Sequence, residues 1–399
     1  MRVSKRSQIL FRVASGDKIP KTYHYLVVGA GFTGAIVAER LASQADKTVL
    51  VIDARSHIAG NAYDTRSDDQ ILYHRYGAHI FHTNSPKVTD YLSNFTDWKP
   101  YEHRVVAMID ERLVPIPFNL TSLKILFPPS DAEKLGKLLI ESYGWGSSVP
   151  ILKMRQNQHA GIRELADFVY CNVFRGYTKK QWDLEPEELS PSVTARVPVN
   201  ISSDDRYFKD SFQSMPKHGY TAMFQRILAH PNIDVSLSTS YNDIRDQVRF
   251  GRLVYTGAID EFFEFACGSL PYRSLSFDFQ TYHVPRHQSV AVINYPNSKT
   301  YTRIIEMGHL TQEWGDKTMV AIETPIAHVP GLTVPYYPIP RGDNHLLHHN
   351  YMEYAKKEAA NVVFAGRLGG YRYFNMDQAV GHALQVFEEI VKTQPRAPR

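Results

Sequence analysis

The sequence is poor in cysteine, with only Cys171 and Cys267 among 399 residues. Two thiols are too few for a disulfide framework or a four-thiolate metal site, and such usage is typical of proteins of a reducing cytoplasm. No run of about 18 apolar residues occurs, so we expect no stable membrane insertion. The formal net charge is only +4, which gives no reason to expect nucleic acid as a partner.

Aromatic side chains are plentiful, with 24 Tyr and 20 Phe that could stack on ring-shaped ligands. The length suits two or three domains, at about 100–200 residues each. Residues 1–22 are basic and contain no signal-peptide core, so we expect a loose extension before a fold that begins near Tyr23. Such a basic tail could also touch an anionic surface.

Three segments predict a parallel strand–helix–strand unit. Tyr25 to Gly29 and Thr48 to Asp53 are short apolar runs, and Ala35 to Ser43 between them has helical spacing. Further strands are expected at residues 233–238, 252–257 and 361–366, and a helix at residues 376–393. The pieces of the parallel sheet are therefore scattered along the chain.

The two intervening regions differ in composition and in the periodicity of their apolar residues. Residues 101–170 contain amphipathic helical stretches, and residues 265–336 are rich in Tyr, Val, Ile and Thr, as antiparallel strands are. We expect an α/β protein with a discontinuous Rossmann-type domain (residues 23–100, 217–264 and 337–399). We also expect a helical insertion with a mobile lid (101–170). The third part would be a substrate domain formed by a largely antiparallel sheet (171–216 and 265–336).

A glycine-rich motif follows the first expected strand and opens the first helix. Gly29 permits the tight turn, Gly31 lets a pyrophosphate approach the backbone, and Gly34 lets the helix pack on the strand, with Thr33 beside them. Asp53 ends the second strand, where it could accept ribose hydroxyls. Together these features predict dinucleotide binding.

The dinucleotide is predicted to be FAD. The run after the second strand, with Gly60 and Asn61, resembles FAD-binding proteins, in which the backbone again approaches the cofactor. Arg367 after the last strand, and the helix start at Met376 and Asp377, resemble their final flavin contact, where a helix N-terminus favours negative charge on the ring.

Many ordered motifs resemble the bacterial UDP-galactopyranose mutase family, from Tyr23 to about Val391. They include Tyr76-Gly-Ala-His79-Ile80-Phe-His82, Phe174-Arg-Gly-Tyr177-Thr-Lys-Lys-Gln-Trp182, Arg196-Val-Pro-Val, Asp205-Arg-Tyr207, Pro216-Lys-His-Gly-Tyr220, Asn294-Tyr, Tyr301-Thr-Arg303, Tyr336-Tyr337-Pro and Gly366-Arg367-Leu with Tyr371-Arg-Tyr373.

The resemblance implies an enzyme that interconverts UDP-galactopyranose and UDP-galactofuranose without net redox change. Reduced FAD is implied as the nucleophile: its N5 atom takes the sugar as a covalent adduct while UDP leaves, and UDP then returns to the furanose. An external reductant such as NAD(P)H, a homodimer, a cytoplasmic location and a role in cell-surface polysaccharide synthesis are implied as well.

Site residues follow from the matching positions. Arg196 and Arg303 are implied as catalytic cations for the leaving diphosphate, a role that suits the planar fork of arginine. The residues implied for substrate binding are Phe174 and Tyr177 beside uracil, Trp182 near the galactose, Asn294, and Tyr207, Tyr337 and Tyr373 as hydrogen-bond donors to phosphate. His79 is implied as a third catalytic residue and, with Ile80, as a contact beside the flavin, and Tyr373 is implied as a further cofactor contact.

A metal site at His79 and His82 is the alternative for the histidine segment. No acidic or cysteine partner is nearby at ligand spacing, so we expect no metal there. A packed, neutral histidine beside the flavin, whose imidazole or carbonyl accepts a hydrogen bond, is the preferred interpretation.

Three positions depart from the family pattern: Val173 replaces a frequent aromatic, Asn200 a frequent arginine, and Asn375 the usual acid before Asp377. The sugar could therefore differ, for example in UDP-N-acetylgalactosamine or a deoxy relative. A flavin oxidoreductase of related fold, and a non-catalytic protein that binds nucleotides or a membrane surface, are the other hypotheses.

Overall fold

The computed structural model describes residues 22–393, and the expected strand–helix–strand unit is present in it. It consists of β1 (Thr22–Val28), α1 (Phe32–Ala45) and β2 (Val49–Asp53). In β1, Val27 packs in one hydrophobic cluster and Leu26 in another, because successive side chains of a strand point to opposite faces. Burial of both faces explains the continuous apolar run. The predicted basic extension lies outside the described residues, apart from Thr22.

A five-stranded parallel sheet is built from the start, middle and end of the chain, which confirms the Rossmann-type fold. Its order is β12-β2-β1-β13-β19, and every pair is parallel. The other strands are β12 (Ile233–Leu237), β13 (Arg249–Tyr255) and β19 (Val362–Phe364). The predicted C-terminal helix, α15 (Met376–Lys392), packs on α1. Around the sheet lie α2 (Pro86–Ser93), α9 (Tyr220–Ile227), α10 (Tyr241–Ile244), α11 (Ile259–Phe262), α13 (Gly342–Glu358) and α14 (Gly366–Gly369).

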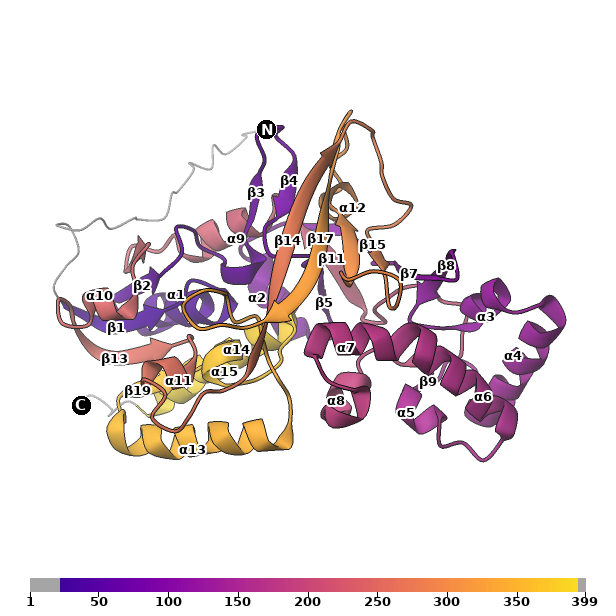
Figure 1. The fold of residues 1–399 in the computed structure, drawn as a ribbon. Helices are drawn as coiled ribbons and strands as arrows, with labels where there is room; N and C mark the ends of the chain where they lie inside the picture. Colours follow the sequence, from indigo (N-terminus) through magenta and orange to yellow (C-terminus); the bar gives the residue numbers. More distant parts are fainter. Residues whose placement is uncertain (1–21, 394–399) are drawn as a thin grey trace.

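A seven-stranded, largely antiparallel sheet stands beside the parallel one, as predicted. Its strands, in spatial order, are β18 (Tyr337–Pro338), β14 (Tyr272–Tyr282), β17 (Thr318–Ala327), β16 (Arg303–Glu306), β15 (Val292–Asn294), β7 (Val105–Ile109) and β8 (Arg112–Ile116). The pair β15 and β7 is parallel, and the other pairs are antiparallel. Figure 1 shows the long strands β14 and β17 between the parallel sheet at one end of the molecule and a group of helices at the other.

That group of helices differs from the predicted insertion at both boundaries. It comprises α3 (Leu120–Leu126), α4 (Pro129–Tyr143), α5 (Ile151–Met154), α6 (Ala160–Val169), the π-helical segment η3 (Tyr170–Arg175), α7 (Gly176–Trp182) and α8 (Pro191–Thr194). Residues 101–119 were expected to be helical but supply β7 and β8, because Val105, Ala107 and Ile109 are buried with the period of a strand. The helical run continues past residue 170 to Trp182, so the boundary at 170 is also wrong.

Small sheets connect these parts. They pair β5 (Phe81–Thr83) and β6 (Trp98–Pro100) with β11 (Phe212–Pro216), β9 (Ser148–Val149) with β10 (Val199–Asn200), and β3 (Asp64–Arg66) with β4 (Leu72–His74). Short elements complete the fold: η2 (Gly60–Ala62), η4 (Pro186–Glu188) and α12 (Met307–Thr311). Residues 171–216 therefore do not join the large sheet, contrary to the predicted substrate domain. Among residues 22–393, no helix has the length and hydropathy of a membrane span.

Candidate active site

A cavity of about 650 Å³ lies at the carboxyl ends of the parallel strands. In open α/β sheets, this edge is where ligands bind. Ten of the residues predicted to bind the cofactor line it: Gly29, Gly31, Thr33, Gly34, Asp53, Gly60, Asn61, His79, Arg367 and Met376. The cavity thus collects residues from the beginning and the end of the chain.

Two of the motif glycines, Gly29 and Gly34, are required sterically. Gly29 has φ +103°, and a Cβ there would lie 2.0 Å from Thr256 Oγ1. A Cβ on Gly34 would lie 1.9 Å from the carbonyl oxygen of Gly29. Gly31 and Gly60 face each other, since a Cβ on Gly60 would lie 3.0 Å from the Cα of Gly31. These contacts keep the floor of the cavity free of side chains, as a pyrophosphate requires.

Polar groups around this floor suit an anionic dinucleotide. Asp53 accepts the N–H of Ala30 on Oδ2 and the N–H of Arg55 on Oδ1, both at 2.9 Å, which fixes the turns after β1 and β2. Arg55 donates from Nη2 to Asn61 at 2.9 Å, while its Nη1 is buried without a partner. No side chain caps α1, whose N-cap is Gly31. An unpaired guanidinium nitrogen and an uncapped helix start both favour a phosphate here.

The predicted flavin histidine, His79, lies on a loop and lines the cavity. Its Nδ1 lies 2.9 Å from the carbonyl oxygen of Gly77, and its backbone N–H donates to His74 Nδ1 at 3.2 Å. Burial lowers the pKa of His79 to about 3, so the ring is neutral at pH 7. A neutral ring that donates from Nδ1 keeps Nε2 as a hydrogen-bond acceptor.

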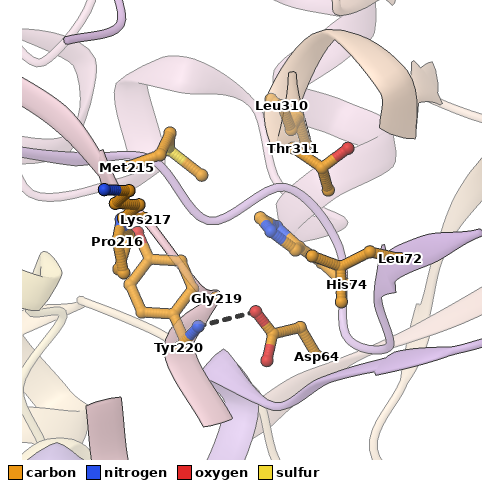
Figure 2. Close-up of a pocket in the computed structure, with 10 residues that line it drawn as sticks. All are labelled: Asp64, Leu72, His74, Met215, Pro216, Lys217, Gly219, Tyr220, Leu310 and Thr311. Atoms are coloured by element: carbon orange, nitrogen blue, oxygen red, sulfur yellow. Dashed lines mark hydrogen bonds between the residues drawn. The ribbon is translucent and has the colours of Figure 1, made fainter. Parts of the chain in front are cut away.

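A buried polar cluster around Asp64, His74 and Tyr220 (Figure 2) makes hydrogen bonds to this loop. Asp64 accepts the backbone N–H groups of Tyr220 and Thr221, at 2.6 and 2.7 Å, and so holds the start of α9. The Tyr220 hydroxyl donates to the carbonyl oxygen of His79 at 3.2 Å. The hollow between these groups measures only about 10 Å³, which is room for at most one water molecule. The cluster is therefore a support for His79 and not a ligand site.

The two predicted catalytic arginines are held in different ways. Arg303 Nη2 lies 2.8 Å from Glu323 Oε2, and the Glu323 side chain is fully buried. Burial alone would lower the pKa of Arg303, but the charge of Glu323 raises it well above the ordinary value. Arg196 instead lies over the ring of Tyr373, at 4.1 Å from its centroid, and donates to Asn375 Oδ1.

The predicted substrate tyrosines gather around these arginines. Burial raises the pKa of Tyr207, and the positive charges of both Arg303 and Arg196 oppose that shift, so Tyr207 feels both cations. Burial likewise raises the pKa of Tyr177, against the charge of Arg303. Tyr207 and Tyr177 are therefore neutral phenols that can donate hydrogen bonds.

An aromatic corner connects this cluster to the cavity. The rings of Trp182 and Tyr337 each lie with centroids 5.2 Å from Tyr373, nearly perpendicular to it. Arg367, which lines the cavity, lies over the ring of Tyr337 at 5.2 Å. The sugar and cofactor residues predicted from the sequence thus form one continuous region.

Four other predicted residues do not line the cavity. Phe174 and Ile80 belong to the main hydrophobic core, and neither lines the cavity. Asp377 accepts from the Thr83 hydroxyl at 3.2 Å, and its other oxygen is buried without a partner. Asn294 is paired with Arg303 across β15 and β16, and its Oδ1 is also buried without a partner. His82 Nδ1 lies 2.9 Å from Asp210 Oδ2, and residues 22–393 contain no group of three candidate metal ligands.

Three parts of the site were not predicted from the sequence: two segments that line the cavity, and Glu323. Thr239 to Arg245 and the segment around Tyr255 and Phe262 line the far end of the cavity. Both follow parallel strands, β12 and β13, so their position after those strands was a usable signal. Glu323 gave no signal, because only the pairing of β16 with β17 brings it opposite Arg303.

The arrangement defines a class: a dinucleotide-binding enzyme whose cofactor cavity adjoins a cluster of arginine and tyrosine side chains. Comparisons with known proteins narrow it. The family described as UDP-galactopyranose mutase matches residues 172–373, and the description NAD(P)-binding Rossmann-like domain matches residues 27–95.

Individual relatives cover almost the whole chain. A probable UDP-galactopyranose mutase of Klebsiella pneumoniae is 35% identical over 92% of this chain and 94% of its own length. The UDP-galactopyranose mutase of Mycoplasma pneumoniae is 33% identical over 93% and 96%, and a dTDP-fucopyranose mutase of Escherichia coli is 33% identical over 92% and 98%. The chain belongs to the UDP-galactopyranose mutase family of enzymes.

Solved structures share the fold. A reduced UDP-galactopyranose mutase superimposes with a TM-score of 0.70 at 14% identity, covering 93% of this chain and 94% of that chain. A putrescine oxidase variant with redesigned cofactor binding reaches a TM-score of 0.58 at 12% identity, covering 93% and 99%. At these identities the likeness concerns the fold alone.

Proposed function

We propose that this chain binds FAD and interconverts UDP-galactopyranose and UDP-galactofuranose. The single observation that carries the proposal is that Arg196, which lies over Tyr373, and Arg303 both act on the pKa of the buried Tyr207, next to the aromatic corner that adjoins the dinucleotide cavity. An oxidoreductase acting on an amine would have no use for two cations at that place.

FAD is supported by the unfilled polar groups of the cavity. Arg55, Asn61 and the open start of α1 would hold the pyrophosphate, Asp53 the ribose, and His79 the edge of the flavin ring. When bound and reduced, the flavin would supply a nucleophile for the anomeric carbon of the sugar.

The chain itself would handle the leaving group. Arg303 and Arg196 would stabilise the negative charge that grows on the diphosphate as the anomeric C–O bond breaks, because preorganised cations act strongly where water is excluded. Tyr207, Tyr337 and Tyr373 would donate hydrogen bonds to phosphate oxygens, and Tyr177 would flank the uracil. The same groups would hold UDP for its return.

The test is turnover of purified protein in two oxidation states. With dithionite, UDP-galactofuranose should become UDP-galactopyranose, resolved by chromatography; without reductant it should persist. A flavin oxidoreductase would instead change its flavin redox state with substrate and show no affinity for UDP. Conversion that is equally fast on oxidised protein, or absent from reduced protein that contains FAD, would refute the proposal.

The same assay should also test which sugar nucleotide is the preferred substrate. The dTDP-fucopyranose mutase among the relatives is almost as similar as the galactose enzymes, so dTDP-fucofuranose and UDP-N-acetylgalactosamine should be offered beside UDP-galactofuranose. We propose that UDP-galactofuranose has the highest kcat/KM. Faster conversion of either competitor would reassign the substrate while leaving the reaction class intact.

Several finer points stay predictions: an external reductant such as NAD(P)H, a homodimer, a cytoplasmic location, a mobile lid and a role in polysaccharide synthesis. If the chain were a membrane-surface protein that used its basic extension, deletion of residues 1–21 would abolish its function. We expect the deletion to leave turnover unchanged.

A further inference from the structure

The two site arginines differ in the charge of their partners. Arg303 faces the buried carboxylate of Glu323 at 2.8 Å, so much of its charge is balanced within the protein. Arg196 has neutral partners: it donates to Asn375 Oδ1 and, at 3.3 Å, to the carbonyl oxygen of Tyr373. Within residues 22–393, no carboxylate lies at ion-pair distance from Arg196.

Asn375 is fixed where it can control that charge. It lines the cavity and is the N-cap of α15. Its own backbone N–H donates to Gln378 Oε1 at 2.9 Å. The backbone of Asn375 is therefore fixed at the start of the helix, and its side-chain oxygen accepts a hydrogen bond from Arg196.

We propose that Asn375 is a positioning residue that orients Arg196 without neutralising it, so that its charge remains available for the diphosphate of the substrate. The inference rests on the proposed function. The acid that is usual in the family at this position would form an ion pair with Arg196 and balance part of its charge, as Glu323 does for Arg303. A neutral acceptor fixes the geometry and leaves the electrostatic attraction for the ligand.

The chain offers a closely matched pair of variants. Asn375→Asp has nearly the same shape, and Asp is as good an N-cap as Asn, so α15 should be preserved while one negative charge is added beside Arg196. Gln378→Glu adds the same charge three residues away on an exposed side chain, and Glu can still accept the N–H of Asn375. The control therefore separates the effect of a negative charge in contact with Arg196 from the effect of a negative charge elsewhere near the site.

The experiment is calorimetric titration of oxidised holoenzyme with UDP and, separately, with uridine, which lacks the diphosphate. For Asn375→Asp we expect the Kd of UDP to rise about tenfold or more, as the loss of one close cation–phosphate attraction implies. The Kd of uridine should stay within about twofold, a difference worth less than 0.5 kcal/mol. Gln378→Glu should leave both Kd values near wild type, and both variants should keep their flavin absorbance and melting temperature.

Each contrary result has a definite meaning. If wild type binds UDP and Asn375→Asp binds it equally well, the inference is overturned and the proposed function stands. If UDP and uridine weaken together, Asn375 shapes the pocket and does not set its charge, which also overturns the inference. If flavin-loaded wild type does not bind UDP at all, the proposed function falls and the inference falls with it.

Discussion

At the scale of single residues, the two arginines of the site differ: Arg303 is paired with a carboxylate, and Arg196 is hydrogen-bonded to neutral groups. Glu323 is fully buried beside Arg303, and a buried carboxylate is stable only when it is paired. Arg303 therefore has two effects, since it compensates the charge of Glu323 and its own charge acts on Tyr177 and Tyr207. Its replacement should affect stability and turnover by separate routes, which can be measured separately.

Replacing Arg303 with alanine should slow turnover at saturating substrate by about 10²–10³-fold, because about 3–4 kcal/mol of charge stabilisation is lost. Flavin absorbance per protein should change little. Arg286→Ala, which removes an exposed arginine that lies over Trp314, is the matched control and should keep full turnover. An unchanged kcat in Arg303→Ala would remove Arg303 from the reaction.

The glycines of the cavity floor make a second residue-scale prediction. Gly29→Ala should destabilise the fold, because its φ is +103° and the new Cβ would lie 2.0 Å from Thr256 Oγ1. Gly31→Ala meets nothing closer than the Cα of Gly60 at 3.7 Å, so the apoprotein should fold normally and lose affinity for FAD. Thermal unfolding with and without FAD distinguishes the two; equal melting temperatures for both apoproteins would contradict this assignment.

At the scale of elements, residues far apart in the sequence are fixed by a few buried contacts. Asp64 at the start of β3 holds the first turn of α9, and α9 in turn supplies the hydroxyl that binds the carbonyl oxygen of His79. The position of the histidine loop thus depends on a helix whose first residue, Tyr220, lies 141 positions after His79 in the sequence.

Asp64→Asn tests that support. The amide has one acceptor oxygen where the carboxylate accepts two backbone N–H groups, so one buried donor loses its partner, at a cost of about 1–3 kcal/mol. Denaturant unfolding should show this loss, and Asp68→Asn, on an exposed side chain, should not. Equal unfolding midpoints in both variants would contradict the role of Asp64.

Prediction from sequence succeeded where local pattern determines structure. The apolar runs gave β1 and β2, and the glycine spacing located the dinucleotide cavity. It failed at residues 101–119, where β7 and β8 were mistaken for helix because their partner β15 lies almost 190 residues away. The pairing of Arg303 with Glu323 and the burial of Phe174 likewise depend on tertiary contacts, which no local pattern encodes.

At the scale of the whole molecule, buried histidines link stability to pH. Burial lowers the pKa of His74 to about 4, and of His79 and His103 to about 3. In the unfolded chain each would bind a proton near pH 6.5. The unfolded state therefore binds more protons below that pH, and stability falls as the pH drops from about 6.5 toward the folded pKa values.

The free energy of unfolding should therefore decrease by about 2–4 kcal/mol between pH 7 and pH 5.5, before most carboxylates titrate. Urea titrations at several pH values measure it. His218→Gln, on an exposed side chain, should leave the slope unchanged, and His74→Gln should reduce it. A flat profile over this range would mean that the three histidines are not buried as described.

The central claim is that the bond between the anomeric carbon and the diphosphate breaks while Arg196 and Arg303 hold UDP. The most direct test uses UDP-galactopyranose with ¹⁸O in the bridging position, followed by phosphorus NMR. With reduced holoenzyme, the account predicts that the label spreads into non-bridging oxygens of the β-phosphate as isomerisation proceeds, and that oxidised holoenzyme gives no spread. Isomerisation with the label retained in the bridge would contradict it.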